Sequence, residues 1–274
     1  MVKIKGRTFV VSGGVSGLGL SAVHSIVEGG GSVAVFDRDS DAGTKLEKEI
    51  GPKHCKFYAT DVSSTESIKT SIAAVIEWIQ NSGHALGGVV TAAGIGINTP
   101  AITHSGQTLN VEHWDQVLRV NTRGSIDLAT QLLPHWIKDS SARESIDGHN
   151  PDNDRGAIVF VSSIASFEGS PGMSAYAASK AAIMGAVLPL ARELGEYGIR
   201  VVSIAPGAFQ TPMYESIPEA VTAGYLRSMP FPKRAGNPER YFGPFVVHIL
   251  ENAFINGTTL RLDGGLRMPW EALE

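Results

Sequence analysis

Two side chains with complementary acid/base chemistry lie four residues apart in the alanine-rich run Tyr176-Ala177-Ala178-Ser179-Lys180. In a helix, this spacing places Tyr176 and Lys180 on one face. A free phenol has a pKa of about 10, and lowering it by about three units requires roughly 4 kcal/mol of preferential stabilisation of the phenolate. An ammonium about 4 Å away, in an effective dielectric near 20, supplies on the order of 4 kcal/mol. The pair therefore predicts an acid/base that works near neutral pH, whereas the same pair on a solvated helix face would have no catalytic role.

A hydroxyl group that could orient a substrate oxygen precedes this helix. Ser163 lies 13 residues before the tyrosine, directly after the apolar run 157–162, which is typical of a strand. A side chain at the carboxyl end of a strand in an open α/β sheet faces the ligand crevice, and a serine there can hydrogen-bond a substrate oxygen. Ser162 is a rival by position, and Ser166 and Ser170 are rivals by type, so the residues alone leave the choice open.

A glycine-rich turn lies between the apolar run 7–12 and the helical segment 20–28. It reads Ser12-Gly13-Gly14-Val15-Ser16-Gly17-Leu18-Gly19. Glycines allow close backbone approach, and the start of the following helix presents free N–H groups and a positive dipole end to a pyrophosphate. The spacing is looser than in the common Gly-x-Gly-x-x-Gly motif, and such a turn can also serve packing alone.

An acidic residue follows where a ribose contact is expected. Asp37 ends the apolar run 32–37, 18 residues after Gly19. Its carboxylate can accept hydrogen bonds from the adenosine ribose hydroxyls and would repel a 2′-phosphate. This favours NAD over NADP, although the neighbouring Arg38 could reach a 2′-phosphate. The alternative role of Asp37 is to cap a helix or to solvate a loop.

Short runs rich in β-branched residues alternate along the chain with longer segments of helical periodicity. This alternation is typical of a parallel sheet with helices on both faces. Strands are expected at 7–12, 32–37, 56–60, 87–92, 157–162, 200–205 and 258–262, with long helices at 111–133 and 175–197. Because no linker or repeat divides the chain, we expect a single α/β domain over residues 1–274, a doubly wound Rossmann fold of about seven strands.

Two segments interrupt this alternation. The polar residues near 138–155 are typical of a surface loop. The connection near 207–237 is unusually apolar and would suit a lid over an apolar substrate, with a pair of short helices capping the core as the alternative. Its large apolar residues are Phe209, Met213, Tyr214, Ile217, Tyr225, Leu226, Met229 and Phe231.

Composition narrows the class of partner. The 274 residues are 43% hydrophobic and 18% charged with a formal net charge of −4, which is typical of a globular protein and indicates neither a nucleic-acid partner nor an anionic membrane. The single cysteine, Cys55, is expected to face the core. The eight histidines lack metal-ligand spacing, so no metal is expected. We recognise no membrane-spanning run or presequence and expect a cytoplasmic protein that acts on small molecules.

Together these motifs resemble the short-chain dehydrogenase/reductase family over about residues 5–268. The resemblance implies an NAD-dependent oxidoreductase that moves a hydride between the nicotinamide ring and a secondary alcohol or ketone. It selects Ser163 among the serines and completes a catalytic tetrad with Tyr176, Lys180 and Asn121, where Asn121 supports a proton relay from Lys180 to solvent.

The resemblance also implies which residues contact the cofactor. Asp61 and Val62 correspond to the pair that contacts the adenine, and Thr211 corresponds to the threonine that contacts the nicotinamide carboxamide. The full implied set is Ser12, Gly13, Ser16, Gly17, Leu18, Gly19, Asp37, Asp61, Val62, Ala93, Gly94, Tyr176, Lys180, Pro206, Gly207 and Thr211.

Two positions depart from the family pattern. The chain has Thr91-Ala92-Ala93-Gly94 where the family commonly has Asn-Asn-Ala-Gly, and Ser12 stands where threonine is usual. The first change removes side-chain amides that brace the central sheet and the cofactor loop, so it is expected to make the cofactor site less rigid. Neither change touches the chemistry.

Four runs outside the universal motifs are similar to the branch of the family that oxidises 3-hydroxyacyl-CoA thioesters, and they span 167–169, 204–212, 230–236 and 261–268. The resemblance implies that reaction, in lipid metabolism, with two alternatives: a ketoreductase or dehydrogenase for a steroid, polyol or secondary metabolite, or a non-catalytic NAD-binding subunit. It also implies a homotetramer or homodimer with the two long helices and the C-terminal strand at interfaces. Members of this branch are mitochondrial, which is the alternative to the cytoplasm.

Overall fold

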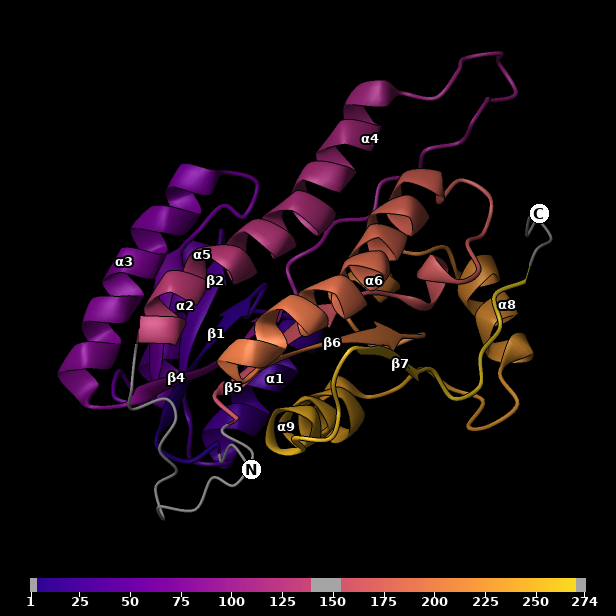
Figure 1. The fold of residues 1–274 in the computed structure, drawn as a ribbon. Coiled ribbons are helices and arrows are strands. Elements are labelled where there is room, and N and C mark those ends of the chain that lie inside the picture. Colours follow the sequence, from indigo (N-terminus) through magenta and orange to yellow (C-terminus); the bar gives the residue numbers. More distant parts are fainter. Residues whose placement is uncertain (1–3, 139–153, 270–274) are drawn as a thin grey trace.

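The computed structural model describes residues 4–138 and 154–269 and shows a parallel sheet at the centre of the molecule (Figure 1). The sheet has seven strands in the order β3-β2-β1-β4-β5-β6-β7. The strands are β1 (Arg7–Ser12), β2 (Ser32–Asp37), β3 (Cys55–Ala59), β4 (Ala85–Thr91), β5 (Gly156–Val161), β6 (Ile199–Pro206) and β7 (Thr258–Leu262). All seven predicted strands are present; β1, β2 and β7 have the predicted bounds, and the others differ by one or two residues.

Helices cover both faces of this sheet (Figure 1). One face carries α3 (Thr65–Ser82), α5 (Ser125–Lys138) and α6 (Ser174–Leu194), and the other carries α1 (Gly17–Glu28), α2 (Ser40–Ile50) and α9 (Gly243–Glu251). Successive side chains of a strand point to opposite faces, so Val89 of β4 joins the first hydrophobic core and Val90 joins the second. The predicted doubly wound Rossmann fold is confirmed.

The two long predicted helices are present with changes of detail. The segment predicted at 111–133 consists of α4 (Val111–Leu118), the π-helix η1 (Arg119–Gly124) and α5, in unbroken succession. Helix α6 and the following 3₁₀ turn η4 (Gly195–Tyr197) match the prediction at 175–197. By length and composition, α6 with η4 could also cross a membrane, which the sequence pattern did not indicate. In this fold, α6 packs instead on β6 and α4.

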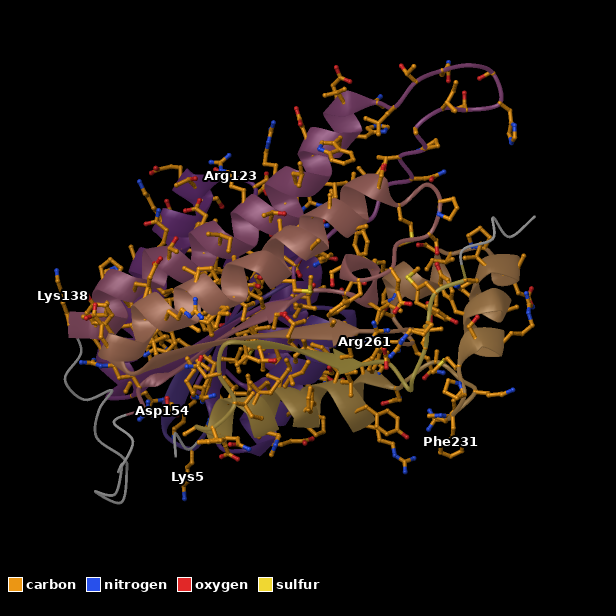
Figure 2. All side chains as sticks on the ribbon, turned by 45° about the vertical axis from the view of Figure 1, so that its right-hand side comes forward. Lys5, Arg123, Lys138, Asp154, Phe231 and Arg261 are labelled. Atoms are coloured by element: carbon orange, nitrogen blue, oxygen red, sulfur yellow. The ribbon has the colours of Figure 1, made fainter. Side chains whose placement is uncertain are left out.

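The apolar segment near 207–237 contains two short helices, α7 (Pro212–Glu215) and α8 (Glu219–Ser228). This is the arrangement considered as the alternative to a lid. Tyr225, Met229 and Leu266 are buried in a third hydrophobic cluster at this end of the sheet. Phe231, by contrast, is 82% exposed and lies at the periphery (Figure 2).

Some sequence predictions concern residues outside the described ranges. Residues 139–153 form most of the loop predicted near 138–155, and residues 1–3 and 270–274 are the chain ends. The surface loop and the targeting of the chain therefore stay predictions.

The order of the strands creates a crevice. β1 pairs with β2 on one side and with β4 on the other, so successive connections run outward in opposite directions from the centre of the sheet. In open α/β sheets, ligands bind where the strand order reverses, beyond the carboxyl ends of the strands. The site is therefore expected next to the loops that follow β1 and β4.

Candidate active site

A cleft of about 890 Å³ opens at these carboxyl ends. The predicted residues that line it are Gly13, Ser16, Gly17, Leu18, Gly19, Asp37, Asp61, Val62, Ala93, Gly94, Ser163, Tyr176, Lys180, Pro206, Gly207 and Thr211. The other two predicted residues, Ser12 and Asn121, are buried at 1% and 0% exposure and lie behind its wall. The fold thus brings together residues that are far apart in sequence.

The loops that follow β1 and β4 touch each other at the base of the cleft. Gly13 has a φ of +67°, and a Cβ added there would lie 2.7 Å from the backbone nitrogen of Ala93. Only glycine therefore lets the two loops approach this closely. The N–H of Ala93 donates to Ser12 Oγ at 3.3 Å, so the hydroxyl at this position ties the two loops together.

The start of α1 offers free backbone donors to the cleft. Ser16 is the N-cap residue, but its side chain makes no capping hydrogen bond, and the first turn has no acidic residue. A Cβ at Gly17 would lie 3.2 Å from Thr211 Cγ2, and one at Gly19 would lie 2.1 Å from the carbonyl oxygen of Gly13. The uncapped N–H groups, the dipole of α1 and this tight backbone fit the pyrophosphate of a dinucleotide.

The carboxylate of Asp37 is oriented by backbone donors at the end of β2. Its Oδ1 accepts from the N–H groups of Arg38 (2.7 Å) and Asp39 (3.2 Å), and its Oδ2 accepts from the N–H of Val15 (3.4 Å). Asp39, not Asp37, caps α2, because its side chain accepts from the N–H of Ala42 at 3.0 Å. The capping alternative for Asp37 is therefore wrong, and its carboxylate lines the cleft next to the exposed Arg38.

Asp61 and Val62 form the wall beyond β3. Burial raises the pKa of Asp61, but hydrogen bonds from Ser63 and the charge of Arg38 outweigh burial and lower that pKa below its usual range. Asp61 is therefore an anion that holds its own loop, with its Oδ1 accepting from the N–H of Ser63 at 2.9 Å. A Cβ at Gly124 would lie 2.5 Å from the carbonyl oxygen of Val62, so η1 packs directly on this wall.

Helix α6 carries Tyr176 in its first turn and Lys180 one turn later. Lys180 Nζ lies 5.8 Å from the centroid of the Tyr176 ring and donates to the carbonyl oxygen of Val161 at 2.8 Å. Helix α6 has no capping side chain of its own. Instead Thr99 Oγ1, from the loop after β4, accepts from the N–H of Ala175 at 3.2 Å. The sequence did not reveal this role of Thr99, because its partner lies 76 residues away.

Hydrogen bonds distinguish the candidate serines. Ser162 Oγ donates to the carbonyl oxygen of Lys180 at 2.8 Å, and Ser166 Oγ donates to that of Ser163 at 2.5 Å. Ser163 Oγ accepts from the N–H of Ala165 at 3.1 Å, which leaves its own proton free to donate. Ser163 is thus the one of these three that lines the cleft with a hydroxyl still able to bind a substrate oxygen.

Asn121 lies within η1, and single turns of π-helix frequently mark functional sites. Its Oδ1 accepts from the N–H of Ile95 at 2.8 Å, and its Nδ2 donates to the carbonyl oxygen of Ile95 at 2.9 Å and to Ser179 Oγ at 3.0 Å. The side chain therefore fastens the loop after β4 to α6, beside Lys180.

The pKa values of the acid/base pair follow from their shared burial. Loss of water contacts raises the pKa of the half-buried Tyr176, and a side-chain hydrogen bond with Ser163 offsets this only in part. Burial lowers the pKa of Lys180 to about 8. The predicted lowering of the phenol pKa by Lys180 is wrong for the chain alone, because the prediction weighed the ammonium charge and left out desolvation of the phenol.

The departure from the family pattern at Thr91 leaves a buried hydroxyl group, Thr91 Oγ1, without a hydrogen-bond partner among the residues that the structure describes. The amide bracing that the family pattern would supply at this point is thus missing. The loop after β4 is instead held by Ser12 and Asn121.

Many of the residues that line the cleft are apolar, and the part of the lining that they form is called the apolar half below. The segment 207–237 contributes five of the eight large apolar residues singled out from its sequence: Phe209, Met213, Tyr214, Ile217 and Tyr225. The sequence missed the apolar residues that loops bring to this half, because single residues in loops show no periodicity: Ile95, Ile97, Ile164, Met173, Leu266 and Met268. Tyr225 is 7% exposed, and burial raises the pKa of its phenol while a hydrogen bond with Ser170 opposes the shift.

A switch-point cleft with a glycine turn, a carboxylate at the end of β2 and a tyrosine–lysine pair is typical of nucleotide-dependent oxidoreductases. A family model for short chain dehydrogenase matches residues 7–222, and the chain belongs to this family. It is an oxidoreductase, and its cofactor is a nicotinamide dinucleotide.

Several relatives are similar over nearly their full length. The chain is 36% identical over 269 residues to 3-hydroxyacyl-CoA dehydrogenase type-2 of Homo sapiens, covering 97% of each protein. It is 35% identical over 266 residues to the protein of the same name from Drosophila melanogaster, covering 97% of this chain and 99% of that protein. The crystal structure of 3-hydroxyacyl-CoA dehydrogenase type-2 from Mycobacterium avium aligns with a TM-score of 0.85 at 31% identity, covering 99% of this chain and 100% of that one. The family and the branch predicted from sequence are confirmed.

Proposed function

We propose that the chain interconverts a 3-hydroxyacyl-CoA thioester and its 3-oxo product, with NAD as cofactor. One observation carries the proposal: Tyr176, Lys180 and Ser163 line the same cleft as the glycine turn and the apolar residues. A substrate whose acyl chain contacts these apolar residues would place its alcohol carbon next to Tyr176 and Ser163. Similarity to 3-hydroxyacyl-CoA dehydrogenases over the whole chain supports the choice of substrate.

The side chains divide the chemistry of the alcohol group. In the oxidative direction, Tyr176 accepts the hydroxyl proton, and Ser163 donates a hydrogen bond that holds the substrate oxygen next to the phenol. Lys180 keeps a positive charge beside the phenol and would bind ribose hydroxyls, and Asn121 supports the route by which the proton leaves. When bound, the nicotinamide ring supplies the hydride acceptor.

The choice of NAD over NADP rests on Asp37. Its carboxylate lines the cleft at the end of β2, where it would accept from ribose hydroxyls and repel a 2′-phosphate. Asp37→Ala is expected to lower the preference for NADH over NADPH by about 10-fold or more, since hydrogen bonds to charged groups contribute about 1.5–3 kcal/mol. Arg38→Ala is the matched control and should leave the preference for NADH intact. An unchanged preference in Asp37→Ala would contradict this assignment.

The lining of the cleft also favours a second candidate function. Among the described residues that line it, the only basic ones are Arg38 and Lys180, and neither belongs to the apolar half. The phosphates of CoA would therefore lie outside the cleft. An uncharged apolar alcohol, such as a hydroxysteroid, has no phosphates that need basic residues, and it would fit the apolar half.

A spectrophotometric assay separates the two candidates. Oxidation of NADH or NADPH is followed with acetoacetyl-CoA, with simple ketones and with steroid ketones as substrates. The proposal expects the highest kcat/KM with acetoacetyl-CoA and NADH. A higher kcat/KM with a simple ketone or a steroid ketone would contradict the thioester as substrate and would favour the second candidate.

Two further properties are proposed, a lid on the basis of the apolar sequence of one segment and an assembly on the basis of the resemblance. Residues 207–237 would act as a substrate lid, because α7 and α8 line the apolar half. The chain would form a homotetramer or homodimer. Exposure of the apolar side chains Val111 on α4 and Leu188 on α6 supports contact between copies of these helices, and light scattering coupled to gel filtration measures the assembly.

A further inference from the structure

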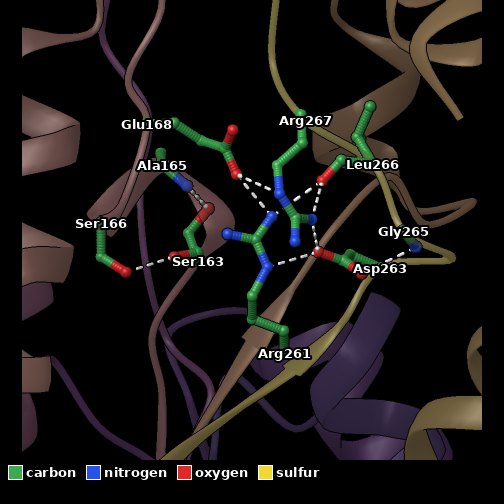
Figure 3. Close-up of polar contacts among 9 residues, drawn as sticks. All are labelled: Ser163, Ala165, Ser166, Glu168, Arg261, Asp263, Gly265, Leu266 and Arg267. Atoms are coloured by element: carbon green, nitrogen blue, oxygen red, sulfur yellow. Dashed lines mark hydrogen bonds and ion pairs between the residues drawn. The ribbon is translucent and has the colours of Figure 1, made fainter.

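A cluster of charged side chains lies beside the turn that carries Ser163, and Arg261 of β7 is at its centre (Figure 3). Arg261 Nε donates to Asp263 Oδ2 at 2.7 Å. Its Nη2 donates to Glu168 Oε1 and, at 2.8 Å, to the carbonyl oxygen of Leu266. The guanidinium carbon also lies 5.1 Å from the centroid of the Phe167 ring. One side chain thus holds two segments of the chain that are about 90 residues apart.

The first of these segments is the turn that carries the catalytic serine. Ser163 is the N-cap of the 3₁₀ turn η3 (Ile164–Ser166). The N–H of Ser166 donates to the carbonyl oxygen of Ser163 at 3.0 Å, and the N–H of Glu168 donates to that of Ile164 at 3.2 Å. Because these bonds close the turn, anchoring Glu168 also anchors Ser163.

The second segment is a wall of the cleft. Leu266 is 1% exposed, packs in the third hydrophobic cluster with Ile164 and Tyr225, and lines the cleft. Asp263 Oδ1 accepts from the N–H of Gly265 at 2.9 Å, so the carboxylate that receives Arg261 also shapes the bend that leads to Leu266. Arg261 therefore connects the serine that faces the substrate oxygen to the surface that faces the apolar part of the substrate.

The chemistry of this contact requires arginine. A planar guanidinium can serve several acceptors in fixed directions while it stacks on an aromatic ring, which a lysine ammonium cannot do. The side chains of Arg261 and Glu168 are 22% and 24% exposed, so water screens their attraction less than that of a surface pair. Arg267, next along the chain from Leu266, also donates to the carbonyl oxygen of Leu266 at 2.8 Å. It approaches the two carboxylates only at 4.0 Å and 3.6 Å, however, and is 63% exposed.

We propose that Arg261 is a positioning residue for catalysis, which holds the Ser163 turn in register with the Leu266 wall through Glu168. The inference rests on the proposed function only in that Ser163 orients the substrate oxygen; it does not depend on which alcohol is the substrate.

The test is a double-mutant cycle on kcat, measured with whichever ketone or thioester the wild-type protein reduces fastest. Arg261→Met should lower kcat by about 10- to 100-fold, because a misplacement of about 1 Å at a reacting centre can cost that much. The same substitution in a Ser163→Ala background should lower kcat by less than about threefold, because the two residues act as one unit. NADH affinity, from fluorescence titration, should be unchanged in all variants.

Matched variants keep the test decisive. Arg267→Met removes an equal charge from the same segment and should leave kcat within about twofold of wild type. Arg261→Lys and Glu168→Gln keep the fold with smaller changes, and each should lose part of kcat without loss of NADH binding. An equal loss of kcat with and without the Ser163→Ala substitution, or no loss on changing Arg261, would overturn the proposal. If the proposed function is wrong, the wild-type protein will not turn over acetoacetyl-CoA, and that result is independent of the comparison between variants.

Discussion

Replacing Lys180 by methionine is expected to stabilise the protein at pH 7 while it removes the activity. Lys180 is 4% exposed, and burial lowers the pKa of its ammonium from 10.5 to about 8. One pKa unit corresponds to about 1.4 kcal/mol, so holding this charge costs the folded protein about 3 kcal/mol at pH 7. Methionine fills a similar space and loses the hydrogen bond to Val161, worth about 1 kcal/mol. The net gain of about 2 kcal/mol should raise Tm by roughly 4–8 °C.

The sign of the pH dependence follows from proton binding by Lys180. Below about pH 8 the lysine is protonated in both the folded and the unfolded chain, and the full cost of burial is present. Between the folded pKa of about 8 and the unfolded value of 10.5, the unfolded chain binds more protons than the folded one, so the stability of the wild type rises with pH. The advantage of the methionine variant should therefore shrink across this window.

Scanning calorimetry of both proteins without added cofactor, at about pH 7 and about pH 10, measures this difference, since every other titrating group is common to the two. Lys48→Met is the matched control, because Lys48 is an exposed lysine on α2. Its Tm should differ from the wild type by less than about 2 °C at either pH. A lower Tm for Lys180→Met at pH 7, or a Tm difference that does not change with pH, would refute the argument from burial.

The remaining predictions concern the phenol of Tyr176, the glycine turn and the buried thiol. Tyr176→Phe should lower kcat by about 10²- to 10⁴-fold with unchanged NADH affinity; full activity would end its assignment as the acid/base. Gly13→Ala should lose at least about 2 kcal/mol in urea unfolding, because its φ is +67° and a Cβ would meet backbone at 2.7 Å. Gly195→Ala, in right-handed backbone with no atom within 4 Å of its Cβ, should lose nothing. Cys55, whose thiol pKa burial raises to about 12, should react with iodoacetamide only after denaturation, and rapid labelling of native protein would contradict its burial.

Features that depend only on residues close together in the sequence could be predicted. The strands were found because runs of β-branched residues fill positions that are buried on both faces of a parallel sheet. The pair Tyr176 and Lys180 could be placed on one helix face because the helical repeat is a property of the backbone. The turn that contains Gly13 follows a strand and precedes a helix, an order that can be read directly along the chain.

Contacts between distant segments could not be predicted in this way. The amide of Asn121 holds Ile95, and Thr99 caps a helix that begins 75 residues later. Neither residue type carries a periodic signal, and the resemblance to a known family indicated a role for only the first. That Asp39 rather than Asp37 caps α2 was also visible only in the hydrogen bonds themselves.

The sequence by itself determined the order of the strands and helices, the placement of Tyr176 and Lys180 on one helix face, and the glycine turn, because these follow from backbone periodicity and from the side chain at each position. Only the tertiary structure decided the direction in which the pKa of Tyr176 shifts, since desolvation depends on every segment that closes over the phenol. It likewise decided that Arg261 meets Glu168, because an ion pair between segments so far apart in the chain exists only once β7 has joined the edge of the sheet.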